Sequence, residues 1–299
     1  MTPELILGSM AGLVGSAVFA FSVVVYRSQS KEIRPLAISS IKMWVALPVM
    51  AFALLLPFAG NPLTVPLHTM FLLAISILFG AVIGDTIYLI SQERIGVSYA
   101  FPVAMSFPIM TFAFTIFFLG EPLIVTRLVG AVIAVVGIVI LSNEQSKENS
   151  SSEESGISDV IGIGLALLTA LLYAAGTTIL QVGLSDIDPF AGNFLRVAFG
   201  SIAFVPMFAV ARYRGMPRPT MRATKVVAIA GFFGMGIGSL LYVTAVKYAG
   251  AAITSVLAST APLWAVPVSV FFLKERLTRM SVVGILATVV GVFLVIMGF

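Results

Sequence analysis

The sequence predicts an all-α polytopic membrane protein with ten transmembrane helices, arranged as two inverted repeats of five helices. Three observations predict this: a strongly apolar composition, recurring apolar runs of helical length, and an internal duplication in one register. Of the 299 residues, 59% are hydrophobic and 10% are charged, whereas about a quarter of a soluble domain is charged. A soluble globule of this length could not bury so many helices that are apolar on every side.

The apolar runs are about 20 residues long, which is the length a helix needs to cross the hydrocarbon core. A membrane β-barrel would need short segments that alternate apolar and polar residues, but runs such as 128–141 are continuously apolar. The first run lacks the basic flank and cleavage site of a signal peptide, so we expect a retained helix. The expected helices are 5–27, 36–57, 67–92, 97–119, 123–142, 159–182, 190–211, 224–247, 251–273 and 278–298.

Shifting the chain by 154 positions aligns its two halves without a gap. The clearest marker is a motif of two glycines and a tyrosine at intervals of four residues, found at 80–88 and again at 234–242. Residues of other types match at the same offset: Pro35 with Pro189, Lys42 with Arg196, Pro108 with Pro262 and Glu121 with Glu275. Chance similarity between apolar helices would not keep these residue types in register, so we infer a duplication.

The duplication divides the chain into a first five-helix repeat at 1–142 and a second at 159–299. The segment between them, 143–158, is dominated by Ser, Glu and Lys. Such a composition cannot bury enough apolar surface to fold, so we expect a flexible polar linker.

Each repeat has an odd number of helices, so the two repeats must enter the membrane from opposite sides. With both termini outside the cytoplasmic membrane, the loops place thirteen basic residues inside and two outside, as the positive-inside rule requires. The inner set is Arg27, Lys31, Arg34, Arg94, Lys147, Arg212, Arg214, Arg218, Arg222, Lys225, Lys274, Arg276 and Arg279, and the outer set is Arg127 and Lys247.

Three charged residues lie within apolar segments: Lys42, Asp85 and Arg196. Each costs at least about 2.5–3.5 kcal/mol on insertion scales, so each needs an explanation. Asp85 is either a contact for a substrate ammonium or a protonatable coupling group, or else a structural partner for Lys42 or a threonine hydroxyl. Lys42 and Arg196 are either anchors that reach the membrane surface with their long stems or binding groups for an anion, for which the planar fork of Arg196 is better suited.

Polar and aromatic residues also cluster on helix faces. Tyr173, Thr177 and Gln181 follow one another at intervals of four on the helix at 159–182, whereas Ser259 and Trp264 lie on the helix at 251–273. Singly, such residues more often pack between helices; together they make a polar, aromatic cavity plausible. The candidate substrate-binding residues are Lys42, Asp85, Tyr88, Tyr173, Thr177, Gln181, Arg196, Ser239, Tyr242, Ser259 and Trp264.

Two prolines, Pro108 and Pro262, occupy equivalent positions in the middle of expected helices. Because proline removes a backbone hydrogen bond, paired kinks suit a bending gate, although fixed bends for packing are equally compatible. Glu121 and Glu275 open the last helix of each repeat, where a carboxylate complements the helix dipole, and we expect both to be structural.

The sequence favours no enzyme, cofactor or metal site. The one embedded aspartate has no second carboxylate beside it, and no phosphate loop or dinucleotide motif occurs. The chain contains no cysteine, which excludes disulfides and thiolate metal sites. Its net charge of +4 resides mainly in loops that set orientation, so we expect no nucleic-acid partner.

The repeated five-helix pattern carries a family resemblance. The matching motifs are Ile-Lys-Met-Trp at 41–44, Phe-Leu-Arg-Val at 194–197, and Phe-Phe-Leu-Gly-Glu-Pro-Leu at 117–123 with Phe-Phe-Leu-Lys-Glu-Arg-Leu at 271–277. Together with the glycine-rich third helix, they resemble the EamA-type permeases of the drug/metabolite transporter superfamily over the whole chain except the linker. The resemblance implies a central cavity lined by the first, third, fourth, sixth, eighth and ninth helices.

The same resemblance implies export of small metabolites, often amino acids, by alternating access between the two repeats. We therefore expect a secondary transporter in the cytoplasmic membrane, with a small-molecule substrate, the lipid bilayer and protons as partners, acting as a monomer or homodimer. The alternatives are an uptake or exchange carrier for sugars or phosphorylated, nucleotide-like metabolites and, from a different class, a channel.

Overall fold

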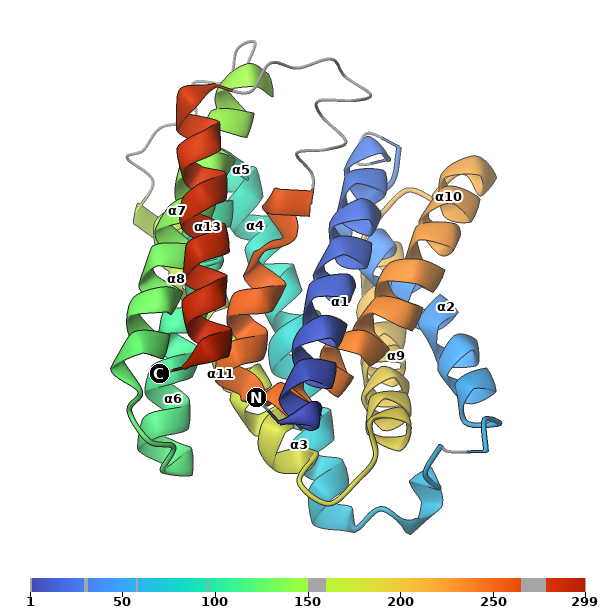
Figure 1. Cartoon of the computed structure of the whole chain (residues 1–299). Helices are drawn as coiled ribbons and strands as arrows, with labels where there is room; N and C mark the ends of the chain where they lie inside the picture. Colours follow the sequence, from blue (N-terminus) through green and yellow to red (C-terminus); the bar gives the residue numbers. More distant parts are fainter. Residues whose placement is uncertain are drawn as a thin grey trace.

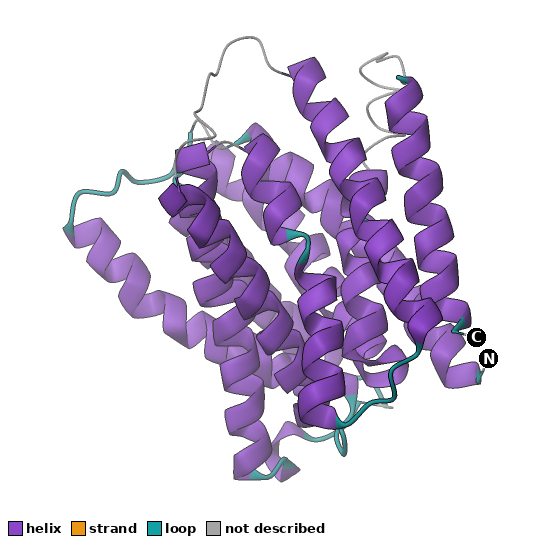
Figure 2. Ribbon diagram, turned by 90° about the vertical axis from the view of Figure 1, so that its left-hand side faces the viewer, coloured by secondary structure: helices purple, strands orange, loops and turns teal. Residues whose placement is uncertain are grey.

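Helices make up all regular structure in the part of the chain that the computed structural model describes, which is residues 2–29, 32–57, 59–95, 97–149, 160–264 and 278–298. They lie side by side in one bundle, with the two chain ends at the same end of it (Figures 1 and 2). The first half contains α1 (Pro3–Ser28), α2 (Pro35–Ala53), η1 (Pro62–Thr64), α3 (Leu67–Ile77), η2 (Leu78–Gly84), α4 (Asp85–Ile95), α5 (Val97–Ala104), α6 (Phe107–Leu119) and α7 (Val125–Asn149). The second half contains α8 (Val160–Gly183), α9 (Pro189–Tyr213), α10 (Met221–Gly231), η3 (Phe232–Gly238), α11 (Ser239–Ser259) and α13 (Arg279–Met297).

Within the described ranges, nine helical segments are long and apolar enough to cross a membrane, so the chain is a multi-pass membrane protein. One of these segments, Met221–Ser259, covers 39 residues and joins two helices that the sequence predicts separately. It is broken at Gly250, whose φ of 84° and ψ of 163° are not helical. Residues 265–273 of the predicted helix 251–273 lie outside the described residues.

The two halves of the chain share the positions at which their helices begin. The equivalent pairs α2 and α9, α3 and α10, η2 and η3, α4 and α11, and α7 and α13 each start 154 residues apart. This is the offset that aligns the sequence with itself. The duplication is therefore visible in the helix boundaries as well as in the residue types.

Two pairs of equivalent helices, α2 with α9 and α7 with α13, pack against each other in opposite directions. In the pair α7 and α13, a Cβ added to Gly130 would lie 2.7 Å from the Gly291 oxygen, and one added to Gly137 would lie 2.6 Å from the Thr288 nitrogen. Residue numbers thus rise along α7 as they fall along α13. The pair α2 and α9 behaves likewise, since Trp44 Nε1 donates to the Ser201 oxygen at 3.1 Å while Met50 meets Asn193.

The first helix of each half packs against the third-helix region of the other half. A Cβ on Gly8 of α1 would touch Ala249 at the end of the first part of α11, and one on Gly162 of α8 would touch Ile95 at the end of α4. These two contacts are themselves equivalent. The halves are therefore interleaved, and the core lies between them, as in the cluster of Met43, Met50, Ile77, Val82, Val197 and Phe204.

Two seven-residue π-helical segments, η2 and η3, interrupt the third-helix region of each half at equivalent positions. A π-turn accommodates one extra residue per turn and is frequent at functional sites. The glycines of the repeated motif lie in these segments. At Gly84 a Cβ would lie 2.5 Å from the Phe79 oxygen and 2.8 Å from the Tyr173 ring, so the close packing onto α8 requires glycine there.

Several predicted boundaries were wrong. The single helix expected at 97–119 is two helices, α5 and α6, separated at residues 105–106. Pro108 lies in the first turn of α6, where its missing N–H has no partner to lose, and not in mid-helix. The helix expected to end at 142 continues to Asn149, so α7 takes up the first seven residues of the predicted linker, whose remainder lies outside the described residues.

Candidate functional site

Asp85 is the centre of a buried polar cluster between the two halves. It is the first residue of α4, directly after η2, and its Oδ2 accepts a hydrogen bond from Lys42 Nζ of α2 at 2.7 Å. Its Oδ1 accepts a second from the Tyr173 hydroxyl of α8, also at 2.7 Å. The Asp85 and Lys42 side chains are 23% and 11% exposed, so they form a largely buried ion pair. The structure thus shows the contact with Lys42 that the structural interpretation of Asp85 expects.

Lys42 is buried within the bundle, whereas a membrane-surface anchor would extend to the exterior. Only 9% of the residue is exposed, and its ammonium is directed at Asp85. A close approach of α2 and α10 fixes its backbone, since a Cβ on Gly231 would lie 2.9 Å from the Lys42 Cα. The pair therefore links α2 to the junction of η2 and α4.

Three residues of α8, which we call the α8 stripe, each bind a residue of another helix or loop: Tyr173, Thr177 and Gln181. Thr177 Oγ1 donates to the Tyr173 carbonyl oxygen at 2.7 Å and lies 2.6 Å from the Tyr242 hydroxyl. A threonine hydroxyl has one proton, so Tyr242 is the donor in the second bond. The α8 stripe joins α8 to α4 through Asp85 and to α11 through Tyr242.

The far end of the α8 stripe is Gln181. Its Nε2 donates to Glu121 Oε1 at 2.6 Å, and its Oε1 accepts a short hydrogen bond from the Ala251 nitrogen, directly after the break at Gly250. Glu121 was expected to support the start of the following helix. The structure instead directs its carboxylate at Gln181, because α7 begins four residues later, at Val125.

Arg196 is the second buried cation, and its surroundings differ from those of Lys42. It lies in α9 with 6% of its surface exposed, and its Nε donates to Ser76 Oγ of α3 at 3.0 Å. No described carboxylate forms an ion pair with Arg196. Like Lys42, it is too deeply buried to serve as a surface anchor.

Ser239, the equivalent of Asp85, is bound to α9 by a neutral contact. Its hydroxyl accepts a hydrogen bond from Asn193 Nδ2 at 2.9 Å and donates to the carbonyl oxygen of Met235 in its own helix. Asn193 Oδ1 is buried and has no hydrogen-bond partner among the described residues. The same position of each repeat therefore carries a carboxylate at Asp85 and a neutral hydroxyl at Ser239.

The remaining candidates lie in other contacts. The ring of Tyr88 packs against that of Phe101 of α5 in an edge-to-face arrangement, with 6.5 Å between the ring centroids. Ser259 donates to the Ser255 carbonyl oxygen within its own helix. Trp264 Nε1 donates to Ser16 Oγ of α1 at 2.8 Å, which places Trp264 in a separate contact between α1 and the segment after Thr260.

The two candidate gating prolines each follow a helix break at an equivalent residue. Ser106, two residues before Pro108, has φ −76° and ψ −3°. Thr260, two residues before Pro262, has φ −73° and ψ 0°. Both repeats thus interrupt their fourth helix in the same backbone conformation.

Sequence reasoning missed two partners of the predicted residues in this region, Ser76 and Asn193, and two further residues of α1, Ser16 and Tyr26. Ser76 and Asn193 bind the predicted residues Arg196 and Ser239, but a small polar residue in a membrane helix usually indicates packing. Tyr26 has a buried hydroxyl without a hydrogen-bond partner among the described residues. The available signal was the embedded tyrosine near the end of the first helix.

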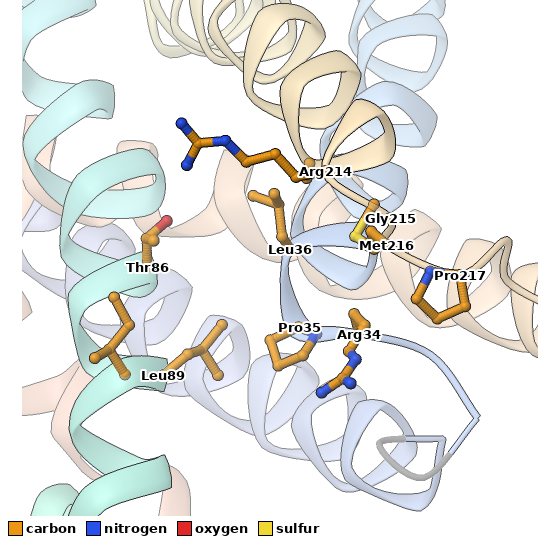
Figure 3. Close-up of a pocket in the computed structure, with 11 residues that line it drawn as sticks. Arg34, Pro35, Leu36, Thr86, Leu89, Arg214, Gly215, Met216 and Pro217 are labelled. Atoms are coloured by element: carbon orange, nitrogen blue, oxygen red, sulfur yellow. The ribbon is translucent and has the colours of Figure 1, made fainter.

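Two cavities lie at opposite ends of the α8 stripe. The first, of about 490 Å³, is lined by Arg34, Pro35, Leu36, Thr86, Leu89, Ile90 and residues 211 and 214–217. Figure 3 shows Arg214 extending from the end of α9 towards Thr86, the neighbour of Asp85. The second, of about 410 Å³, is lined by Gln181 and its neighbours Val182, Leu184 and Ser185, with Leu119, Val246 and Lys247. Because α8 runs antiparallel to α3 and α4, these cavities lie towards opposite ends of the bundle.

The described residues contain no cluster of three or more His, Cys, Asp or Glu side chains that could hold a metal ion. Around Asp85 and Arg196 they provide the Lys42–Asp85 ion pair, a cation without a described carboxylate partner, tyrosine and threonine hydroxyls and an amide.

Comparison with known proteins places the chain among transporters. A protein of Archaeoglobus fulgidus named "Uncharacterized transporter" is 23% identical over 293 residues, covering 96% of this chain and 97% of the relative. The "Uncharacterized inner membrane transporter YhbE" of Escherichia coli is 30% identical over 135 residues, covering 44% of this chain and 41% of the relative.

A solved crystal structure, 17% identical in sequence, superposes with a TM-score of 0.78 over 96% of both chains, and this likeness shows the fold alone. The model of the EamA-like transporter family matches the chain twice, at residues 6–143 and 160–297, so its two matches also lie 154 residues apart. Because these matches cover nearly the whole chain, the protein belongs to the EamA-like transporter family.

Proposed function

We propose that this protein is a secondary transporter that exports small metabolites, amino acids first, across the cytoplasmic membrane by alternating access. The observation that carries the proposal is the position of two cavities towards opposite ends of the α8 stripe, with the hydrogen-bonded polar side chains of the stripe between them. Alternating access needs a site between two access points of this kind.

We further propose ten transmembrane helices in two inverted five-helix repeats, with 1–142 and 159–299 as the repeat units. The antiparallel packing of α2 on α9 and of α7 on α13 supports inversion, because equivalent helices of inverted repeats cross the membrane in opposite directions. The distribution of basic loop residues, thirteen against two, supports termini outside. The cavity with Arg34 and Arg214 then faces the cytoplasm, and the cavity with Gln181 and Ser185 faces outward.

The site suits a small polar solute that carries little net charge. Lys42 and Asp85 neutralise each other, whereas Tyr173, Thr177, Tyr242 and Gln181 offer hydroxyl and amide groups. A carrier for phosphorylated metabolites would need several cations in its cavity. The buried cations on the described helices are Lys42, which is paired, and Arg196, so amino acids fit this site better.

The coupling and gating steps follow from two features. Protonation of Asp85 would release Lys42 and weaken the hydrogen bond from Tyr173, so a proton at Asp85 can change the contact between α2, α4 and α8. The helix breaks before Pro108 and Pro262 are the points at which the fourth helix of each repeat can bend.

The test is transport by the purified protein in liposomes loaded with labelled amino acids. We expect saturable efflux and counterflow, with Asp85→Asn reducing the rate by at least tenfold and altering its dependence on pH. Arg218→Gln, which removes an exposed loop cation, is the control and should transport like the wild type.

Two outcomes would contradict this function. Flux that rises in proportion to concentration without counterflow would indicate a channel. Movement of sugars or phosphorylated compounds, but of no amino acid, would favour the alternative carrier.

A further inference from the structure

The first repeat contains a largely buried ion pair, and the second repeat has the equivalent cation without the equivalent acid. In the first repeat, Lys42 is neutralised by Asp85 at 2.7 Å. Lys42 is equivalent to Arg196 and Asp85 is equivalent to Ser239, because both pairs lie 154 residues apart. The second repeat therefore retains the cation and has a neutral hydroxyl where the first repeat has a carboxylate.

Arg196 is left with donors that the described residues do not use. A guanidinium carries five N–H donors, and those described residues accept from one of them, Nε, through Ser76. The two terminal nitrogens present parallel N–H groups in the geometry that binds a carboxylate through both of its oxygens. A buried cation in this state is costly unless a ligand compensates it.

Arg196 also lies beside the proposed translocation route. The carbonyl oxygen of its partner Ser76 is 3.0 Å from the position of a Cβ on Gly176, and Gly176 precedes Thr177 of the α8 stripe. A ligand that moves along Tyr173, Thr177 and Gln181 thus passes next to Ser76.

We propose that Arg196 binds a carboxylate of the transported substrate, which takes the place of the acid missing at Ser239; this rests on the transport function proposed above. The charges of the described residues suit one carboxylate group beside Arg196 better than a phosphate dianion. Lys42 and Asp85 cancel, so one carboxylate neutralises Arg196, whereas a phosphate dianion would leave the site negative.

The first test needs no ligand. Ser239→Asp supplies the missing acid, so we expect the ligand-free protein to melt roughly 2–5 °C higher than the wild type. Ser255→Asp is the matched control: it buries a carboxylate in the same helix, where no described cation contacts Ser255, and should lower the melting temperature. A fall for Ser239→Asp as large as that of Ser255→Asp would overturn the missing-acid argument.

The second test compares each of the twenty amino acids with its carboxamide, which removes the negative charge and little else. We expect thermal stabilisation by at least one amino acid and binding of its amide at least tenfold more weakly. Arg196→Gln and Ser239→Asp should each weaken binding of that amino acid about 10- to 100-fold, and Arg196→Lys should weaken it less. Arg218→Gln is the control for removal of one positive charge.

The outcomes separate this proposal from the transport function. Equal binding of acid and amide, binding of neutral sugars alone, or an unchanged affinity in Arg196→Gln would overturn the carboxylate proposal and leave a transporter. If no metabolite binds or moves, the transport function itself fails, and the melting temperature of Ser239→Asp still decides whether Arg196 lacks an acid.

Discussion

Buried charges in this protein come in two states, and the difference is set by single residues. Lys42 and Asp85 form a pair that also binds Tyr173, so each charged group has a partner of opposite charge or a hydrogen-bond donor. Arg196 has a serine as its described partner. Removal of Lys42 or Asp85 alone leaves one uncompensated buried charge and should destabilise the protein. Removal of the Arg196 charge should have the opposite effect, because no described carboxylate balances it.

At the residue scale, Asp85→Asn should destabilise the protein by about 2–4 kcal/mol, because it leaves the Lys42 ammonium buried without a carboxylate. The asparagine oxygen can still accept from Tyr173, so the loss reports on the ion pair. Thermal unfolding in detergent measures it.

A double variant provides the control for this prediction. Lys42→Gln combined with Asp85→Asn removes both charges and should recover at least about 1 kcal/mol relative to the sum of the single changes. Strict additivity would mean that the pair contributes no coupling.

At the scale of elements, the membrane-spanning helices approach each other through glycine. Gly291 of α13 faces the backbone of α7, where an added Cβ would lie 2.4 Å from the Ala134 nitrogen and 2.5 Å from the Gly130 oxygen. Backbone atoms cannot move aside as a flexible side chain can. The antiparallel contact of α7 and α13 therefore depends on the absence of a side chain.

Gly291→Ala should lower stability by about 1–3 kcal/mol, because the two helices must separate to admit the methyl group. Gly164→Ala in α8 is the matched control, since a Cβ there meets nothing within 4 Å. It should be neutral or slightly stabilising, because alanine is the better helix former. Equal melting temperatures for the two variants would argue against tight packing at Gly291.

The elements also show what the sequence could and could not predict. The duplication could be read directly, because prolines, glycines and charges mark helix starts locally and keep the same offset. The π-helices η2 and η3 and the break at Gly250 could not, because these depend on how neighbouring helices meet. The sequence offered Lys42 as a partner of Asp85 in one of two alternatives, and the structure shows this contact. The contact of Arg196 with Ser76 joins the two repeats and leaves no periodic signal in the sequence.

At the scale of the whole molecule, the repeat relation makes each half a control for the other. Two equivalent pairs, α2 with α9 and α7 with α13, pack antiparallel, and the first helix of each half packs against the other half, so neither half encloses the polar cluster alone. The two halves differ in residue type at two equivalent pairs of positions: Asp85 with Ser239, and Lys42 with Arg196. The first of these pairs of equivalent positions therefore holds a carboxylate in one half and a neutral hydroxyl in the other.

The inverted topology itself can be tested at one pair of equivalent positions. Leu63 in η1 and Pro217 in the loop after α9 are both exposed and lie 154 residues apart. The chain has no cysteine, so Leu63→Cys and Pro217→Cys each create a single labelling site, and the wild type is the blank. In intact cells, a membrane-impermeant maleimide should label Leu63→Cys at once and Pro217→Cys only after permeabilisation. Inverted repeats place equivalent loops on opposite sides of the membrane, so labelling of both variants from the same side would show that the repeats are parallel and would remove the geometric basis for alternating access.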